Sequence, residues 1–180
     1  NLRPFMPTAL QHPDDLHLRA AQGWLELGNP AEAEAELTRL SAANVQHPDV
    51  LELRWHLYAQ TQDWPACIEV AEKLIDLDPT RADAWIHRSF ALHELKRTQD
   101  AFDRLVTVAD HFTDIWTIPY NLACYCSQLG RLEAAQQWLN KAKSIDAVTV
   151  TKAAAEAETR QCASRADPCQ RHACQRPAKR

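Results

Sequence analysis

Residues 120–139 read YNLACYCSQLGRLEAAQQWL, and this stretch decides the fold because its outline recurs along the chain. Four segments of 34 residues, which begin at Asp14, Pro48, Ala82 and Trp116, align without a gap. The twentieth position of each segment is small in every copy and holds Ala33, Cys67, Ala101 and Ala135. A fixed period of this size indicates stacked supersecondary units, so the sequence predicts a repeat solenoid.

Each copy carries the signals of two antiparallel helices. Asn29 and Asp63 stand just before a first turn that contains proline, which is typical of helix N-caps. Thr80 followed by Asp83 resembles a capping box at the start of the next helix. Only three glycines occur in 180 residues, and the only short strand-like run is residues 147–151, so helix is strongly favoured. We expect helices at about residues 14–27, 30–43, 48–61, 64–77, 82–95, 98–111, 114–129 and 131–145.

Several positions of the repeat follow a known pattern of bulky, small and turn residues. They include Tyr58 and Pro79 in the second copy, Trp85 and Ala101 in the third, and residues 120–135 in the fourth. With these residues the chain resembles the tetratricopeptide repeat family over residues 14 to about 147. The fourth copy also resembles the closing unit of some bacterial repeat arrays. The family resemblance implies an all-α, right-handed solenoid of four helical hairpins. Trp55 departs from the pattern, which has a small residue at that position.

The expected organisation has a lead-in, a repeat domain, a capping helix and a tail. Prolines make residues 1–13 an irregular lead-in, and an Ala-rich stretch within residues 148–166 can form a weakly docked capping helix. The last stretch is short of hydrophobic residues and rich in Arg, Gln and Pro, which predicts disorder. The parts are therefore 1–13, the repeats 14–47, 48–81, 82–115 and 116–147, the capping segment 148–166, and a basic tail, 167–180.

The charge distribution narrows the class of partner. Residues 1–146 hold 13 Lys and Arg against 21 Asp and Glu, a net charge of −8, whereas residues 147–180 hold 7 against 3, a net charge of +4. An acidic body argues against nucleic acid, whose binding needs a basic face. No apolar stretch approaches the length that crosses a bilayer, which argues against a membrane partner. A cytoplasmic location is expected because the first residues have no apolar signal core. The alternative that a signal peptide has already been removed stays open.

The sequence predicts no catalytic site, no cofactor and no metal. Its three glycines form no phosphate-binding loop, and no Gly-x-Ser-x-Gly occurs, so we do not expect an enzyme. Cys162, Cys169, His172 and Cys174 could supply metal ligands, but their spacing matches none of the compact zinc patterns. Most of the six cysteines are expected to be free thiols, because a core built by stacking needs no disulfide.

The family resemblance also implies where a partner binds, namely a concave groove lined by the first helix of each repeat. Carried over to this sequence, the groove residues are Leu18, Gln22, Glu26, Glu52, His56, Ile86, Phe90, His93, Glu94, Tyr120 and Cys124. The groove positions include acidic residues but neither Lys nor Arg, so the basic clamp with which some family members hold a carboxyl terminus is not expected. The predicted partner is a protein or peptide with basic residues and an apolar anchor.

The resulting functional hypothesis is a non-catalytic scaffold or adaptor for protein–protein interaction. A secretion or folding chaperone of similar repeat architecture stays open as an alternative. A regulatory domain excised from a larger enzyme or signalling protein is a further alternative, since the sequence begins without methionine. The partner, the pathway and the oligomeric state are left open by the sequence.

Overall fold

The computed structural model describes residues 9–164, with side chains described up to Glu156. All regular structure in this range is α-helical. The helices are α1 (Asp14–Glu26), α2 (Pro30–Leu37), α3 (Pro48–Gln60), α4 (Trp64–Leu77), α5 (Ala82–Glu94), α6 (Thr98–Val106), α7 (Thr117–Gln128), α8 (Leu132–Ile145) and α9 (Ala147–Ser164). The predicted tail at 167–180 and most of the lead-in lie outside the described residues. None of the helices in the described range is long and apolar enough to cross a membrane.

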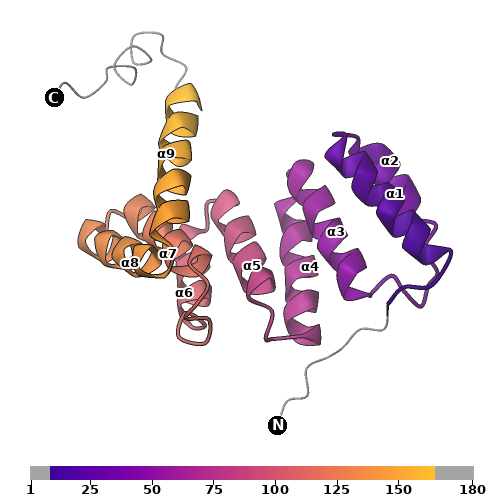
Figure 1. Cartoon of the computed structure of the whole chain (residues 1–180), viewed down its shortest axis with the longest axis horizontal. Coiled ribbons are helices and arrows are strands. Elements are labelled where there is room, and N and C mark those ends of the chain that lie inside the picture. Colours follow the sequence, from indigo (N-terminus) through magenta and orange to yellow (C-terminus); the bar gives the residue numbers. More distant parts are fainter. Residues whose placement is uncertain (1–8, 165–180) are drawn as a thin grey trace.

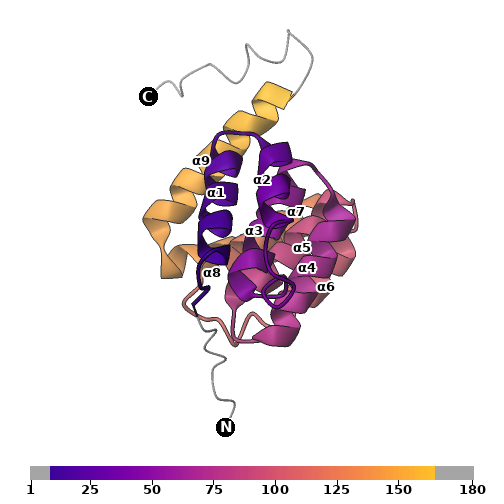
Figure 2. The ribbon, with the colours of Figure 1, turned by 90° about the vertical axis from the view of Figure 1, so that its right-hand side faces the viewer.

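The first eight helices form four hairpins that follow one another through space in chain order (Figures 1 and 2). Each helix packs on the next one along the chain, and α1 also contacts α3 just as α5 contacts α7. Three clusters of buried apolar side chains lie between the packed helices, and they include Leu37, Leu74 and Leu105 respectively. The fold is therefore an all-α helical repeat solenoid, and the prediction from the 34-residue period is confirmed.

The turn inside each hairpin repeats with the same backbone conformation. Gly28, Gln62, Lys96 and Gly130 all have positive φ, between 60° and 74°, and they occupy the same position of the four copies. In each copy the N–H of this residue donates to the carbonyl three residues back, and the next N–H donates to the carbonyl five residues back. This is the Schellman arrangement that ends a helix. The shared geometry supports the repeat register.

Two second helices are shorter than predicted. Helix α2 ends at Leu37 instead of near residue 43, and α6 ends at Val106 instead of near residue 111. A threonine follows each end, and its hydroxyl donates to a carbonyl three residues earlier, 2.7 Å for Thr38 and 2.8 Å for Thr107. Such side-chain bonds compete with the helical pattern, which the hydrophobic periodicity alone does not reveal.

The predicted helix starts are right at two N-caps and wrong at a third. The side chains of Asn29 and Asp63 accept hydrogen bonds from the backbone N–H three residues later, as expected of caps. Thr80 does not cap α5, because its hydroxyl donates to the carboxylate of Asp78 at 2.6 Å. Arg81 occupies the N-cap position without a side-chain cap bond.

The helix α9 begins earlier than the Ala-rich stretch suggested. The β-branched run at residues 147–151 is helical, and the carboxylate of Asp146 accepts the N–H of Thr149 at 2.9 Å as an N-cap. Val150 is fully buried, whereas Val148 is 82% exposed. This segment therefore docks on α8 through one face, and α9 then extends beyond the stack (Figure 1).

The small position of the repeat lies where the helices of a hairpin cross. Ala33, Cys67 and Ala101 are fully buried there. The Cys67 thiol lies 3.7 Å from the carbonyl oxygen of Trp55, and burial raises the pKa of this thiol to about 12. Cys67 is a free thiol, as are Cys124 and Cys126. These three follow the expectation of thiols, and the remaining cysteines lie outside the residues whose side chains are described.

Candidate functional site

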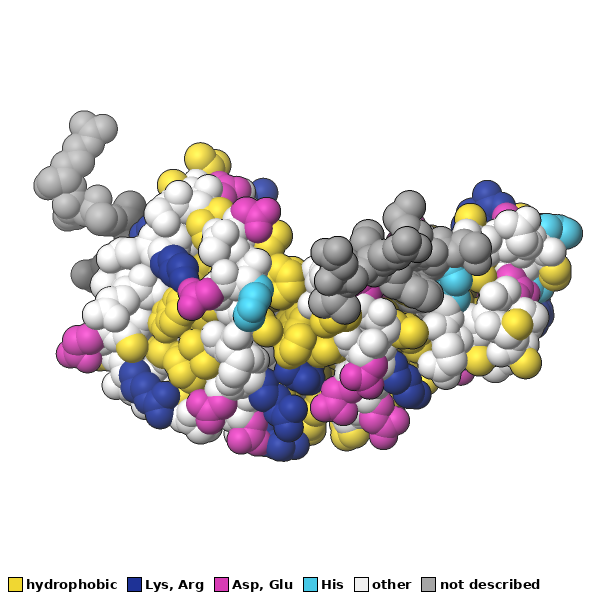
Figure 3. Space-filling view, turned by 90° about the horizontal axis from the view of Figure 1, so that it is seen from below, with side chains coloured by type: hydrophobic (Ala, Val, Ile, Leu, Met, Phe, Trp, Pro, Cys, Tyr) yellow, Lys and Arg dark blue, Asp and Glu magenta, His cyan; other side chains and the backbone are white. Residues whose placement is uncertain are grey.

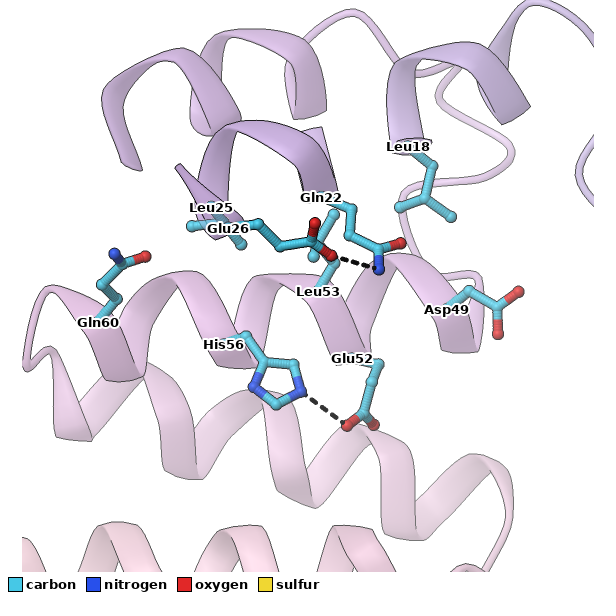
Figure 4. Close-up of a pocket in the computed structure, with 9 residues that line it drawn as sticks. All are labelled: Leu18, Gln22, Leu25, Glu26, Asp49, Glu52, Leu53, His56 and Gln60. Carbon is cyan, nitrogen blue, oxygen red and sulfur yellow. Dashed lines mark hydrogen bonds and ion pairs between the residues drawn. The ribbon is translucent and has the colours of Figure 1, made fainter. Parts of the chain in front are cut away.

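A hollow of about 640 Å³ opens between α1 and α3, at the N-terminal end of the stack (Figure 4). Its lining consists of Leu18, Gln22, Leu25, Glu26, Asp49, Glu52, Leu53, His56 and Gln60. Five of these are groove residues predicted from the repeat pattern: Leu18, Gln22, Glu26, Glu52 and His56. Helical spacing explains the arrangement, because residues three and four apart share a face.

The lining of this first hollow combines carboxylates with leucine side chains. The carboxylate of Glu26 accepts the side-chain amide of Gln22 at 3.1 Å, a neutral donor that leaves its charge uncompensated (Figure 4). The side chain of Asp49 is 62% exposed at the start of α3. Neither Lys nor Arg belongs to the lining. The hollow can therefore receive an apolar group next to a cationic one.

At Glu52 the charge is compensated from outside the lining. The guanidinium of Arg81, in the turn before α5, lies 2.9 Å from Oε2 of Glu52 and 2.6 Å from the carboxylate of Asp83. The hydrogen bond from Arg81 is the main reason why the pKa of Asp83 is lowered despite its burial, and the same bond raises the pKa of Arg81. The groove positions contain neither Lys nor Arg, but the turn between the second and third repeats brings Arg81 to the edge of the groove.

Two histidines face the other oxygen of Glu52. Nε2 of His56 is 3.4 Å from Oε1, and Nδ1 of His87 is 3.6 Å from the same atom. The His87 ring stacks on Trp55, with ring centroids 3.8 Å apart and planes 9° from parallel. Burial lowers the pKa of His87, so the neutral imidazole is favoured. Trp55, the large residue at a position that is usually small, thus supports a histidine at the groove surface.

The middle of the predicted groove is more closely packed than its N-terminal end. Phe90 is 38% exposed and contacts the rings of Trp55 and Trp64 edge-on. Ile86 is half-buried against the core between α5 and α7. His93 lies 3.0 Å from the hydroxyl of Thr98, and burial lowers the pKa of its imidazole. Beside it, Glu94 is half-buried near the end of α5. Of the two predicted apolar residues in the middle of the groove, Phe90 is therefore the more accessible to a partner.

The last two predicted groove residues, Tyr120 and Cys124, line a separate hollow of about 500 Å³. Its other walls come from α8 and α9, including Leu132, Leu139 and Ala154. The structure thus divides the eleven predicted residues among an N-terminal hollow, a packed middle and a C-terminal hollow. Figure 3 shows a face on which acidic and basic side chains lie close together with apolar side chains between them.

The comparisons with known proteins agree with this architecture. Residues 120–149 match a family model described as tetratricopeptide repeat. This segment therefore matches a tetratricopeptide repeat. The matched segment covers residues 120–147 of the fourth copy and two residues beyond it.

Solved structures of MamA have a similar fold. The structure titled MamA 41-end from Desulfovibrio magneticus RS-1 is 22% identical, with a TM-score of 0.66, covering 77% of this chain and 78% of that one. MamA from MSR-1 is 18% identical with a TM-score of 0.64, covering 76% and 78%. None of the curated proteins compared with the chain matches it. At these identities the likeness establishes the fold and not a shared partner.

Sequence reasoning missed two residues at this site, Arg81 and His87. Arg81 lies in a turn that the groove positions do not include. His87 lies one position beyond a groove position of its own copy, and its ring reaches the groove because it stacks on Trp55. The available signal was the pair Glu52 and His56, four apart on one helix. In the next copy, His87 stands one position after the equivalent of Glu52.

Proposed function

We propose that this tetratricopeptide repeat protein is a non-catalytic scaffold for protein–protein interaction, and that a partner peptide binds along the concave surface formed by α1, α3, α5 and α7. Stacked helical hairpins create extended concave surfaces suited to this task. The observation that carries the proposal is the N-terminal hollow, where three carboxylates and three leucines form the lining together with neutral side chains and His56.

The partner that fits this hollow is a segment with Lys or Arg next to an apolar side chain. Because Arg81 already pairs with Glu52, the carboxylates open to a basic partner are Glu26 and Asp49. Leu18, Leu25 and Leu53 supply the apolar contact, and the exposed edge of Phe90 extends it toward the middle of the groove. The sequence predicted a basic partner from the acidic residues along the whole groove, and this proposal assigns the contact with that partner to the carboxylates at the N-terminal end.

The test is fluorescence anisotropy with a labelled synthetic peptide in which Lys residues flank Leu, compared with the same peptide carrying Glu in place of Lys. We expect the basic peptide to bind more tightly. The double variant Glu26→Gln/Asp49→Asn should weaken its binding by about threefold to tenfold, the range that two exposed ion pairs supply. The control is Glu133→Gln, which removes an exposed carboxylate from α8, outside the hollow.

Tighter binding of the acidic peptide would reject the proposed charge preference. Equal losses of affinity per carboxylate removed, in the control and in the double variant, would reject the location, because the effect would then follow net charge and not the hollow.

A further inference from the structure

A second site lies at the edge of the N-terminal hollow, where the side chains of two consecutive repeats converge, and it shares Glu52 and His56 with the lining of that hollow. One possible ligand atom from each of Glu52, His56 and His87 lies within 4.8 Å of the other two. Glu52 and His56 are four residues apart on α3, and His87 comes from α5. We propose that these three side chains bind a divalent transition-metal ion of the zinc or nickel type. This inference does not depend on the proposed peptide binding.

The distances suit a common metal ion. Zinc binds imidazole nitrogen and carboxylate oxygen at about 2.0–2.2 Å, so two such ligands in a tetrahedral site lie about 3.4 Å from each other. The two distances from Glu52 Oε1 are 3.4 Å to His56 and 3.6 Å to His87. A small adjustment of the exposed His56 side chain therefore brings all three atoms onto one ion.

The state of His87 is an independent reason for the assignment. Its Nδ1 is buried and has no hydrogen-bond partner among the described residues. A buried nitrogen without a partner is costly, and a metal ion would satisfy it. Stacking on Trp55 holds the ring in place, with Nδ1 toward the carboxylate of Glu52.

The surroundings of Glu52 support the same geometry. Arg81 holds Oε2 at 2.9 Å, which leaves Oε1 turned toward the two histidines. Partners of this kind commonly orient carboxylate ligands in metal sites. The positive charge of Arg81 opposes a cation nearby, but Asp83, which binds the same guanidinium, offsets part of that charge. Two imidazoles with one carboxylate favour nickel, copper or zinc over magnesium and calcium, whose ligands are oxygen.

Isothermal titration with Zn²⁺ and with Ni²⁺ tests the site. The full chain should carry Cys162→Ser, Cys169→Ser and Cys174→Ser, so that thiolates of the C-terminal segment do not bind the ions. We expect one ion per chain and a melting temperature that rises with ion concentration, because ligands that bind the folded state stabilise it.

The decisive variant is His56→Ala, since this side chain is 54% exposed and its loss should leave the fold intact. It should reduce affinity by at least about tenfold, as loss of a ligand exceeds the effect of a supporting residue. The matched control, His93→Ala, removes a half-buried histidine of the same helix as His87 and should keep the affinity. No binding in the chain with the three cysteine substitutions, or equal affinity in the His56 variant and its parent, would overturn the proposal.

Discussion

At the scale of single residues, the hairpin turns show that backbone geometry can be kept while the residue type changes. Gly28 and Gly130 adopt positive φ without a steric penalty, whereas Gln62 and Lys96 adopt it with a Cβ present. The left-handed conformation costs other residues roughly 1–2 kcal/mol. The two central repeats therefore contain a strained turn that the two outer repeats avoid.

Lys96→Gly should stabilise the protein. Removing the Cβ relieves the strain at φ 64°, and glycine's greater freedom in the unfolded chain offsets part of the gain, which leaves on the order of 0.5–1 kcal/mol. Urea unfolding followed by circular dichroism measures the effect. Lys96→Ala is the matched control, because it removes the same charge but keeps the Cβ. A gain of the same size in both variants would show that the charge, and not the conformation, is responsible.

Asp14 should make stability depend on pH. Its buried carboxylate accepts hydrogen bonds from the N–H and hydroxyl of Ser41 and from the amide of Asn44, and these bonds lower its pKa. A lowered pKa in the folded state means that the contribution is present above the ordinary Asp pKa of about 3.9 and is lost as pH falls through the folded value.

The Asp14→Asn variant tests this contribution. It should be less stable than its parent at pH 7, and the difference should shrink as pH falls below about 4. Thermal melts between neutral and acidic pH measure it, with Asp110→Asn, whose side chain is 94% exposed, as control. A difference that stays constant across this range would contradict the role given to the ionised carboxylate.

At the scale of helices, the small twentieth position sets how closely the two helices approach in the first three hairpins, whereas in the fourth Ala135 is half-buried and lines the C-terminal hollow. Ala33 and Ala101 are fully buried, so a larger side chain has no space there. Packing at this position, and not helix propensity, is what ties the sequence period to the hairpin. Because the period is tied to the hairpin in this way, most helix ends could be predicted from the sequence to within a few residues.

Ala33→Leu should destabilise the protein by about 1–3 kcal/mol, the usual cost of overpacking a filled core. Ala31→Leu is a matched control on the same helix, because residue 31 is exposed and leucine is a good helix former. Urea melts of both variants against the parent measure the difference. Coinciding melts for the two leucine variants would contradict the repeat register.

The helix ends that sequence reasoning missed depend on contacts that periodicity does not encode. The end of α2 depends on the hydroxyl of Thr38 and on Asp14, which binds the backbone at Ser41 from another helix. The start of α9 depends on the cap at Asp146 and on burial of Val150, which together override the strand preference of a β-branched run. Local propensity alone could not reveal either result.

At the scale of the whole molecule, the solenoid follows from the repeat period, but the character of its groove does not. The pattern placed five predicted residues in one hollow. It could not reveal that Arg81 compensates Glu52, because the side chain reaches the groove from a turn between repeats. It also could not reveal the cluster at His87, which requires an unusual tryptophan at a position where the family has a small residue.

The central claim is that a partner binds in the concave groove, with its N-terminal hollow as the main contact. The most direct measurement is nuclear magnetic resonance of the ¹⁵N-labelled full chain, titrated with the synthetic peptide in which Lys residues flank Leu. We predict that the largest shifts of backbone amide signals fall on α1 and α3, around Gln22, Glu26 and Leu53. Shifts concentrated on α2 and α4, or no shifts at any peptide concentration reached, would contradict the claim.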